Sequence, residues 1–148
     1  MTPLPHHYRV ELSGTSSGYA AVEADALPRL RVASPTFYGG PGDAWTPEHL
    51  LLASVEACFM FTLRAICAAS KIRFEELDLV TEGIVDRRDG RTRFTEITLK
   101  PRLVVPSDAD LDRLAQLMTK TERACLITAS LDTPVRVEPE IVVAGCPA

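Results

Sequence analysis

The amino-acid sequence predicts one α+β domain over residues 1–148, with strand patterns before and after a long central helix. Two observations carry this prediction. A length of 148 residues is typical of a single domain that buries a sizeable core. The strand patterns also come in groups instead of alternating singly with helices, which favours a largely antiparallel sheet over a doubly wound fold.

The first third of the chain reads as strands joined by turns. Residues 8–12 alternate apolar and polar side chains, which is the period of a half-buried strand. The polar stretch 13–18 predicts a turn, and residues 19–24 and 29–33 predict two further strands. The following stretch, 34–45, is rich in Gly and Pro and is expected to be a loop.

A helix is predicted from Pro47 to about Ser70. Thr46 fits the N-cap, Pro47 fits the first helical position, and Glu48 suits the positive end of the helix dipole. Apolar residues occupy nearly every face of this helix, so we expect it at the centre of the fold. Because one small sheet cannot cover every face, we infer an intimate homodimer.

Two long strands follow, at residues 77–86 and 93–105, with Asp89-Gly90 as the hairpin signal between them. Ser107 and Asp110 are predicted to open a second helix as a capping box. The apolar stripe of that helix consists of Leu111, Leu114, Leu117 and Met118.

Cys125 follows this stripe, near a break or a new short helix. A last strand is predicted at 134–143, which gives the order βββ–α–ββ–α–β.

Charge and composition exclude several classes of partner. The net charge is −4 and we find no basic block, which argues against nucleic acid and against an acidic membrane surface. Glu56 and Arg64 interrupt the apolar helix, and each would cost roughly 2.5–3.5 kcal/mol inside a bilayer. The first residues lack a secretory pattern, so we expect a cytoplasmic protein.

The cysteines allow either packing or chemistry. They stand at Cys58, Cys67, Cys125 and Cys146, and no pair has the C-x-x-C spacing of a zinc or redox motif. The histidines likewise match no zinc pattern with Cys58, so no metal is expected. Taken alone, Cys58 is a thiol in apolar surroundings, where burial raises the pKa and makes it inert. Taken alone, Glu48 is explained by the helix dipole.

The combination of motifs is more informative than any one residue. Pro47-Glu48 opens the central helix, Ala57-Cys58-Phe59 lies within it, and Cys125 follows 67 residues after Cys58. This pattern resembles the OsmC/Ohr family, the osmotically inducible protein C and organic hydroperoxide resistance proteins. The order of strands and helices also fits, so the resemblance spans nearly the whole chain.

The resemblance implies an OsmC-like fold, in which long helices pack centrally inside antiparallel sheets and two chains form an intertwined homodimer. It also implies reduction of small organic hydroperoxides through a two-thiol cycle. Cys58 would then be the peroxidatic thiolate, Cys125 the resolving thiol, and Glu48 the residue that holds an activating arginine. No cofactor is implied beyond an external thiol reductant.

The chain departs from the family pattern in three places. The first hairpin, residues 13–23, contains no arginine, where peroxidatic relatives supply the activating one. Glu56 replaces a small residue, and Cys125-Leu126 replaces the familiar Cys-Pro. Candidate substitutes for the missing arginine are Arg9, Arg29, Arg31 and Arg123.

Two rival interpretations therefore stay open. One is a non-peroxidatic OsmC-like protein that binds an apolar ligand at the dimer interface. The other is that both cysteines merely pack the core.

Overall fold

The computed structural model describes residues 3–145, and the chain divides into two compact units, Met1–Leu51 and Leu52–Ala148. Helix α1, Pro47–Ser70, begins in the first unit and continues through the second. The elements are those of an α+β protein, as the sequence predicted. The assignment of one domain to residues 1–148 stays a prediction.

The N-terminal unit is built on a three-stranded antiparallel sheet of β1 (Glu11–Gly14), β2 (Ala20–Glu23) and β3 (Leu30–Val32). A short 3-10 helix, η1 (Thr36–Tyr38), follows. All three predicted strands are present. The first begins at Glu11 and not at residue 8, because β2 ends at Glu23, which is the partner of Glu11.

Helix α1 has the predicted bounds and the predicted cap. The Thr46 hydroxyl oxygen accepts a hydrogen bond from the His49 backbone N–H at 3.3 Å, which satisfies one of the free donors of the first turn. Within the second unit a single stripe of α1 is buried, at Val55, Phe59, Leu63 and Cys67. The other apolar faces are not enclosed in one chain, and Phe61 is 61% exposed.

The second unit contains a long hairpin of β4 (Glu76–Arg88) and β5 (Arg91–Val105). Asp89 and Gly90 form its turn with φ angles of 53° and 75°, which confirms the hairpin signal.

The end of the chain differs from the prediction of one last strand. It forms two strands, β6 (Val135–Val137) and β7 (Glu140–Val143), and both run parallel to β5. This sheet is therefore mixed: its long hairpin is antiparallel, as expected, and the two short last strands add parallel pairs to β5. Pro101, which has no N–H to donate, occupies the part of β5 between the two segments that β6 and β7 pair with.

Two helices precede these strands, α2 (Leu111–Ala124) and α3 (Leu126–Ala129). The capping box starting at Ser107 is wrong, because the chain enters α2 three residues later. Asp110 itself is the N-cap, and its carboxylate accepts from the Arg113 backbone N–H at 3.0 Å. Cys125 ends α2 and caps α3, which confirms the short helix expected there.

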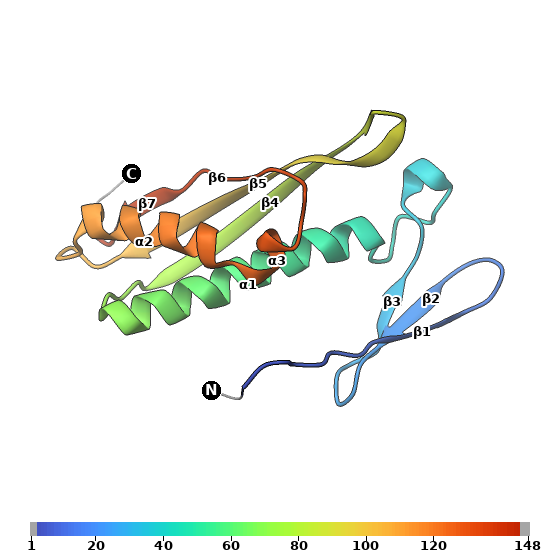
Figure 1. Ribbon diagram of the computed structural model, residues 1–148, viewed down its shortest axis with the longest axis horizontal. Helices are drawn as coiled ribbons and strands as arrows, with labels where there is room; N and C mark the ends of the chain where they lie inside the picture. The colour runs from blue at the N-terminus through green and yellow to red at the C-terminus, as the bar shows by residue number, and fades with distance from the viewer. Residues whose placement is uncertain (1–2, 146–148) are drawn as a thin grey trace. The chain divides into compact units, whose positions relative to one another are not determined.

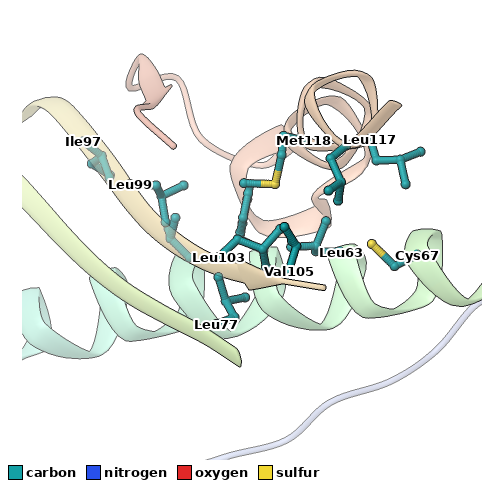
Figure 2. Packing of buried hydrophobic residues seen from close by; sticks show 12 residues of the cluster. Leu63, Cys67, Leu77, Ile97, Leu99, Leu103, Val105, Leu117 and Met118 are labelled. Carbon is teal, nitrogen blue, oxygen red and sulfur yellow. The ribbon is translucent and has the colours of Figure 1, made fainter. Parts of the chain in front are cut away.

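The core of the second unit lies between the helices and one face of the sheet. The buried stripes of α1 and α2 belong to one cluster with the inward residues of β4 and β5, so both helices cover the same face (Figure 1). Figure 2 shows these side chains converging around Leu63, Leu103 and Val105. The opposite face carries exposed ion pairs such as Lys100 with Glu82. The core thus holds the middle of α1 against the end of α2, where the two cysteines lie.

Candidate functional site

Cys58 and Cys125 meet although 67 residues separate them in the sequence. Cys58 lies on α1 directly before the buried Phe59 and is itself half-buried. Cys125 lies at the junction of α2 and α3 and is fully buried. The Cys125 S–H donates a hydrogen bond to the Cys58 sulfur. The structure therefore brings together the two thiols that the family resemblance pairs.

Three further donors surround the Cys58 sulfur. The backbone N–H of Ile127 donates to it with an N···S distance of 3.5 Å. The backbone N–H of Leu126 and the hydroxyl of Thr62 also contribute to lowering the pKa of Cys58. Short α3 supplies the two amides, and Thr62 lies one turn further along α1.

These contacts shift the two thiol pKa values in opposite directions. Burial alone raises the pKa of Cys58, but the hydrogen bonds from Cys125, Ile127, Thr62 and Leu126 together outweigh it and lower the pKa. The pKa of Cys125 is raised, first by burial and then by its donation to Cys58. The pair therefore loses its first proton at Cys58 and keeps the second at Cys125.

No guanidinium hydrogen-bonds Cys58 among residues 3–145. Three of the candidate substitutes lie in the N-terminal unit, and each has a carboxylate partner there: Arg9 with Glu11, Arg29 with Glu23 at 2.8 Å, and Arg31 with Asp43 at 3.3 Å. Arg29 and Arg31 line a groove of about 520 Å³ on that sheet, which contains neither thiol. Arg123 is exposed and lines a separate groove of about 300 Å³ with Thr128 and Thr133.

Glu48 lies in the first turn of α1, as predicted. Its Oε2 atom is buried, and within the described part of the chain it accepts no hydrogen bond. A buried carboxylate oxygen without a donor is costly, so its environment is complete only when a donor reaches it. Its role in holding an arginine stays a prediction.

The remaining residues singled out from the sequence are less informative. Cys67 lies in the buried stripe of α1, where burial raises its pKa, so it packs as a small apolar group. Glu56 is half-buried on α1. Cys146 lies outside the described residues. Within residues 3–145 no three His, Cys, Asp or Glu side chains come together as metal ligands.

Sequence reasoning missed Thr62 and the two amides of α3. Thr62 stands four residues after Cys58, and residues at this spacing are neighbours on a helix face, so this partner was available from the sequence. The two amides could not be predicted from the sequence, because every residue other than proline has a backbone N–H. The direction of these N–H groups depends on where α3 lies.

Comparison with known proteins agrees with this architecture. The family model for OsmC-like proteins matches residues 40–140. YmaD of Bacillus subtilis (strain 168), an uncharacterized protein, is 27% identical over 140 residues, which cover 91% of this chain and 93% of YmaD.

Two solved structures illustrate the shared fold. An OsmC-like protein of unknown function from Vibrio cholerae has a TM-score of 0.83 at 22% identity and covers 91% of this chain and 99% of its own. An organic hydroperoxide resistance protein OsmC from Legionella pneumophila has a TM-score of 0.74 at 21% identity, with 95% and 100% covered. The family model covers well over half of the sequence, and by that match this chain belongs to the family of OsmC-like proteins.

Proposed function

We propose that this protein reduces organic hydroperoxides, with Cys58 as the peroxidatic thiol and Cys125 as the resolving thiol. The observation that carries the proposal is the hydrogen-bonded pair of sulfurs in which the pKa of one is lowered and that of the other is raised. A nucleophile needs the thiolate form at neutral pH, whereas the thiol beside it must keep its proton until the second step. Several proteins of the same fold carry the name organic hydroperoxide resistance protein, which supports the choice of substrate.

The proposed cycle balances in three steps. The Cys58 thiolate attacks the terminal peroxide oxygen, the O–O bond breaks, and the leaving alkoxide takes up a proton to give an alcohol and a Cys58 sulfenic acid. The Cys125 sulfur then displaces hydroxide from the sulfenic sulfur, which releases water and forms the Cys58–Cys125 disulfide. An external dithiol reduces this disulfide by exchange and is itself oxidised.

A homodimer is part of the proposal. α1 is long and apolar enough to cross a membrane by length and composition, yet only 22% of its most apolar window is buried in one chain. Glu56 and Arg64 make a bilayer a poor cover for this helix. Phe61, 61% exposed, and Leu126, 66% exposed, flank Cys58 on α1 and α3. A second copy that covers these faces would enclose an apolar pocket suited to an alkyl or lipid hydroperoxide.

The proposal also gives Glu48 a role in the homodimer. We propose that a guanidinium from either protomer donates to the buried Oε2 atom of Glu48, which has no donor among the described residues.

Thiol consumption with cumene hydroperoxide and dithiothreitol tests the activity. We expect wild type to turn over, Cys58→Ser to lose turnover altogether, and Cys67→Ala to keep it. Cys125→Ser should still form one sulfenic acid per chain, trapped by dimedone and located at Cys58 by mass spectrometry, but no intramolecular disulfide. A folded wild type that consumes no thiol with any alkyl hydroperoxide, yet binds apolar probes, would instead support the non-peroxidatic ligand-binding protein.

A further inference from the structure

We propose that the groove on the three-stranded sheet of the N-terminal unit binds a small organic anion, in which a carboxylate or phosphate is joined to a short apolar body. The groove has a volume of about 520 Å³, which is typical of small-molecule sites. Its lining contains neither Cys58 nor Cys125, so this site is separate from the proposed thiol chemistry.

The register of the sheet places two arginines over the first hairpin. Ser13 of β1, Ala21 of β2 and Arg31 of β3 stand opposite one another across the three strands. Residues in directly opposite positions point to the same face of a sheet. Arg29 stands two positions before Arg31 and also lines the groove, so one face of the sheet presents two guanidinium groups.

Each guanidinium is oriented by a carboxylate that does not itself line the groove. The Nε atom of Arg29 pairs with Glu23 at 2.8 Å, and its Nη2 atom donates to the Ser13 hydroxyl at 3.1 Å. The Nη2 atom of Arg31 donates to the backbone carbonyl of Asp43 at 2.8 Å and to its carboxylate at 3.3 Å. These contacts orient both groups before a ligand arrives, which reduces the conformational entropy lost on binding.

Both arginines retain donors for a ligand. A guanidinium has five N–H donors in a fixed fork, and the contacts of the sheet use only the Nε and Nη2 atoms of Arg29 and the Nη2 atom of Arg31. Among residues 3–145 neither Nη1 atom has an acceptor. A planar fork of this kind matches the two oxygens of a carboxylate or phosphate, so an oxyanion is the ligand group that these donors would recognise.

The remaining lining predicts that the ligand is also partly apolar. Within the described part of the chain the groove is lined by two positive charges and no carboxylate, although the whole protein has a net charge of −4. The Arg31 guanidinium lies over the Tyr19 ring, 4.6 Å from its centroid, and this ring also lines the groove. The lining residues Gly14, Ala20 and Ala21 are small, so a short alkyl chain or ring has room beside the anion.

Isothermal titration calorimetry of the full-length protein with four probes tests the site. Hexanoate and hexyl phosphate carry both an anion and a chain, hexanamide carries a chain without charge, and inorganic phosphate carries charge without a chain. We expect at least one of the two six-carbon anions to bind saturably, one per chain, and roughly tenfold or more tightly than hexanamide or inorganic phosphate. The tighter of the two identifies the preferred anionic group.

Three variants locate the binding. Arg29→Gln and Arg31→Gln should each weaken binding of the preferred anion by roughly tenfold, because each loses a charged donor. Arg9→Gln is the matched control, since Arg9 also pairs with a carboxylate, that of Glu11, but does not line the groove. Ala21→Leu keeps both charges, fills the floor of the groove and should weaken binding by a similar factor. Circular dichroism and thermal melting establish that each variant is folded.

Four results would overturn the proposal. They are no saturable binding to folded wild type, equal affinity for hexanamide or inorganic phosphate, the same loss in Arg9→Gln as in Arg31→Gln, and unchanged binding to folded Ala21→Leu. The last remains decisive even where an arginine variant does not fold. Peroxide turnover does not enter these measurements, so the site and the proposed function stand or fall separately.

Discussion

Cys58 and Cys67 lie nine residues apart on the same helix, yet the fold shifts their pKa values in opposite directions. Both thiols lose contact with water, which raises the pKa of each. Only Cys58 also receives hydrogen bonds, because the end of α2 and the start of α3 reach its side of α1 and bring Cys125 and two amides with them. The same residue type thus has a lowered pKa at one position and a raised pKa at the other, and the difference lies in the neighbouring donors.

The raised pKa of Cys67 predicts a pH-dependent contribution to stability. The protonated thiol contributes stability below the unfolded-state thiol pKa of about 8.5, and this contribution is lost as the pH rises through the higher folded-state pKa. The free energy of unfolding of wild type should therefore fall more steeply above about pH 8.5 than that of Cys67→Ala. Urea unfolding at several pH values measures both slopes, and equal slopes would contradict the assignment.

The contribution of Cys58 to stability depends on pH with the opposite sign. Its lowered pKa means that the stability from its thiolate is present above the unfolded-state pKa and is lost as the pH falls through the folded-state value. This contribution is common to wild type and Cys67→Ala, so it cancels in their comparison.

At the scale of elements, the sequence correctly predicted the features that depend on residues within a single turn. Thr46 caps α1, and Asp89-Gly90 turns the long hairpin, as expected. The prediction failed where two neighbouring residues offered the same chemistry. Ser107 and Asp110 can both cap a helix, and only the path of the chain out of β5 decides that Asp110 does so.

This choice of cap can be measured. Asp110→Ala should cost about 1 kcal/mol of unfolding free energy, within a range of roughly 0.5–2, because the Arg113 N–H loses its acceptor. Ser107→Ala is the matched control and should be nearly neutral, since Ser107 is exposed and precedes the helix. Chemical denaturation of both variants gives the two values. A larger loss of unfolding free energy in Ser107→Ala than in Asp110→Ala would contradict Asp110 as the cap and support the capping box that starts at Ser107.

At the scale of the whole molecule, the apolar faces of α1 outside its buried stripe need a partner that shields them from water. Four residues of the helix are buried in the second unit, while Phe61 remains 61% exposed. A large contiguous apolar surface that stays exposed marks an interaction site. The proposed second copy would bury it, and it would also explain why the sequence made the helix apolar on nearly every side.

The dimer predicts a definite result in solution. Sedimentation equilibrium should give twice the mass of the chain, and Phe61→Glu should weaken the association by at least tenfold, because a charge buried in an apolar interface costs more than about 1.4 kcal/mol. Lys100→Glu on the outer face of the sheet is the control and should leave the mass unchanged, since its ion pair is exposed. A monomeric wild type at micromolar concentration would refute the homodimer.

The pairing of Cys58 with Cys125 came from the family resemblance. The sequence by itself determined the order of the elements as far as α2, the bounds of α1 and the hairpin. These follow from periodicity, capping and turn residues, which act over a few positions and need no knowledge of distant contacts. The parallel pairing of β6 and β7 with β5 did not follow, because strand direction depends on how the chain returns across α2 and α3.

Only the tertiary structure decided the direction in which the pKa of Cys58 shifts. The sequence showed an apolar helix without the expected arginine, and these features by themselves favoured an inert, buried thiol. The fold brings Cys125 and the free amides of α3 to a sulfur that already has Thr62 beside it. Hydrogen bonds of this kind depend on direction and distance between segments far apart in the chain, and no local pattern encodes them.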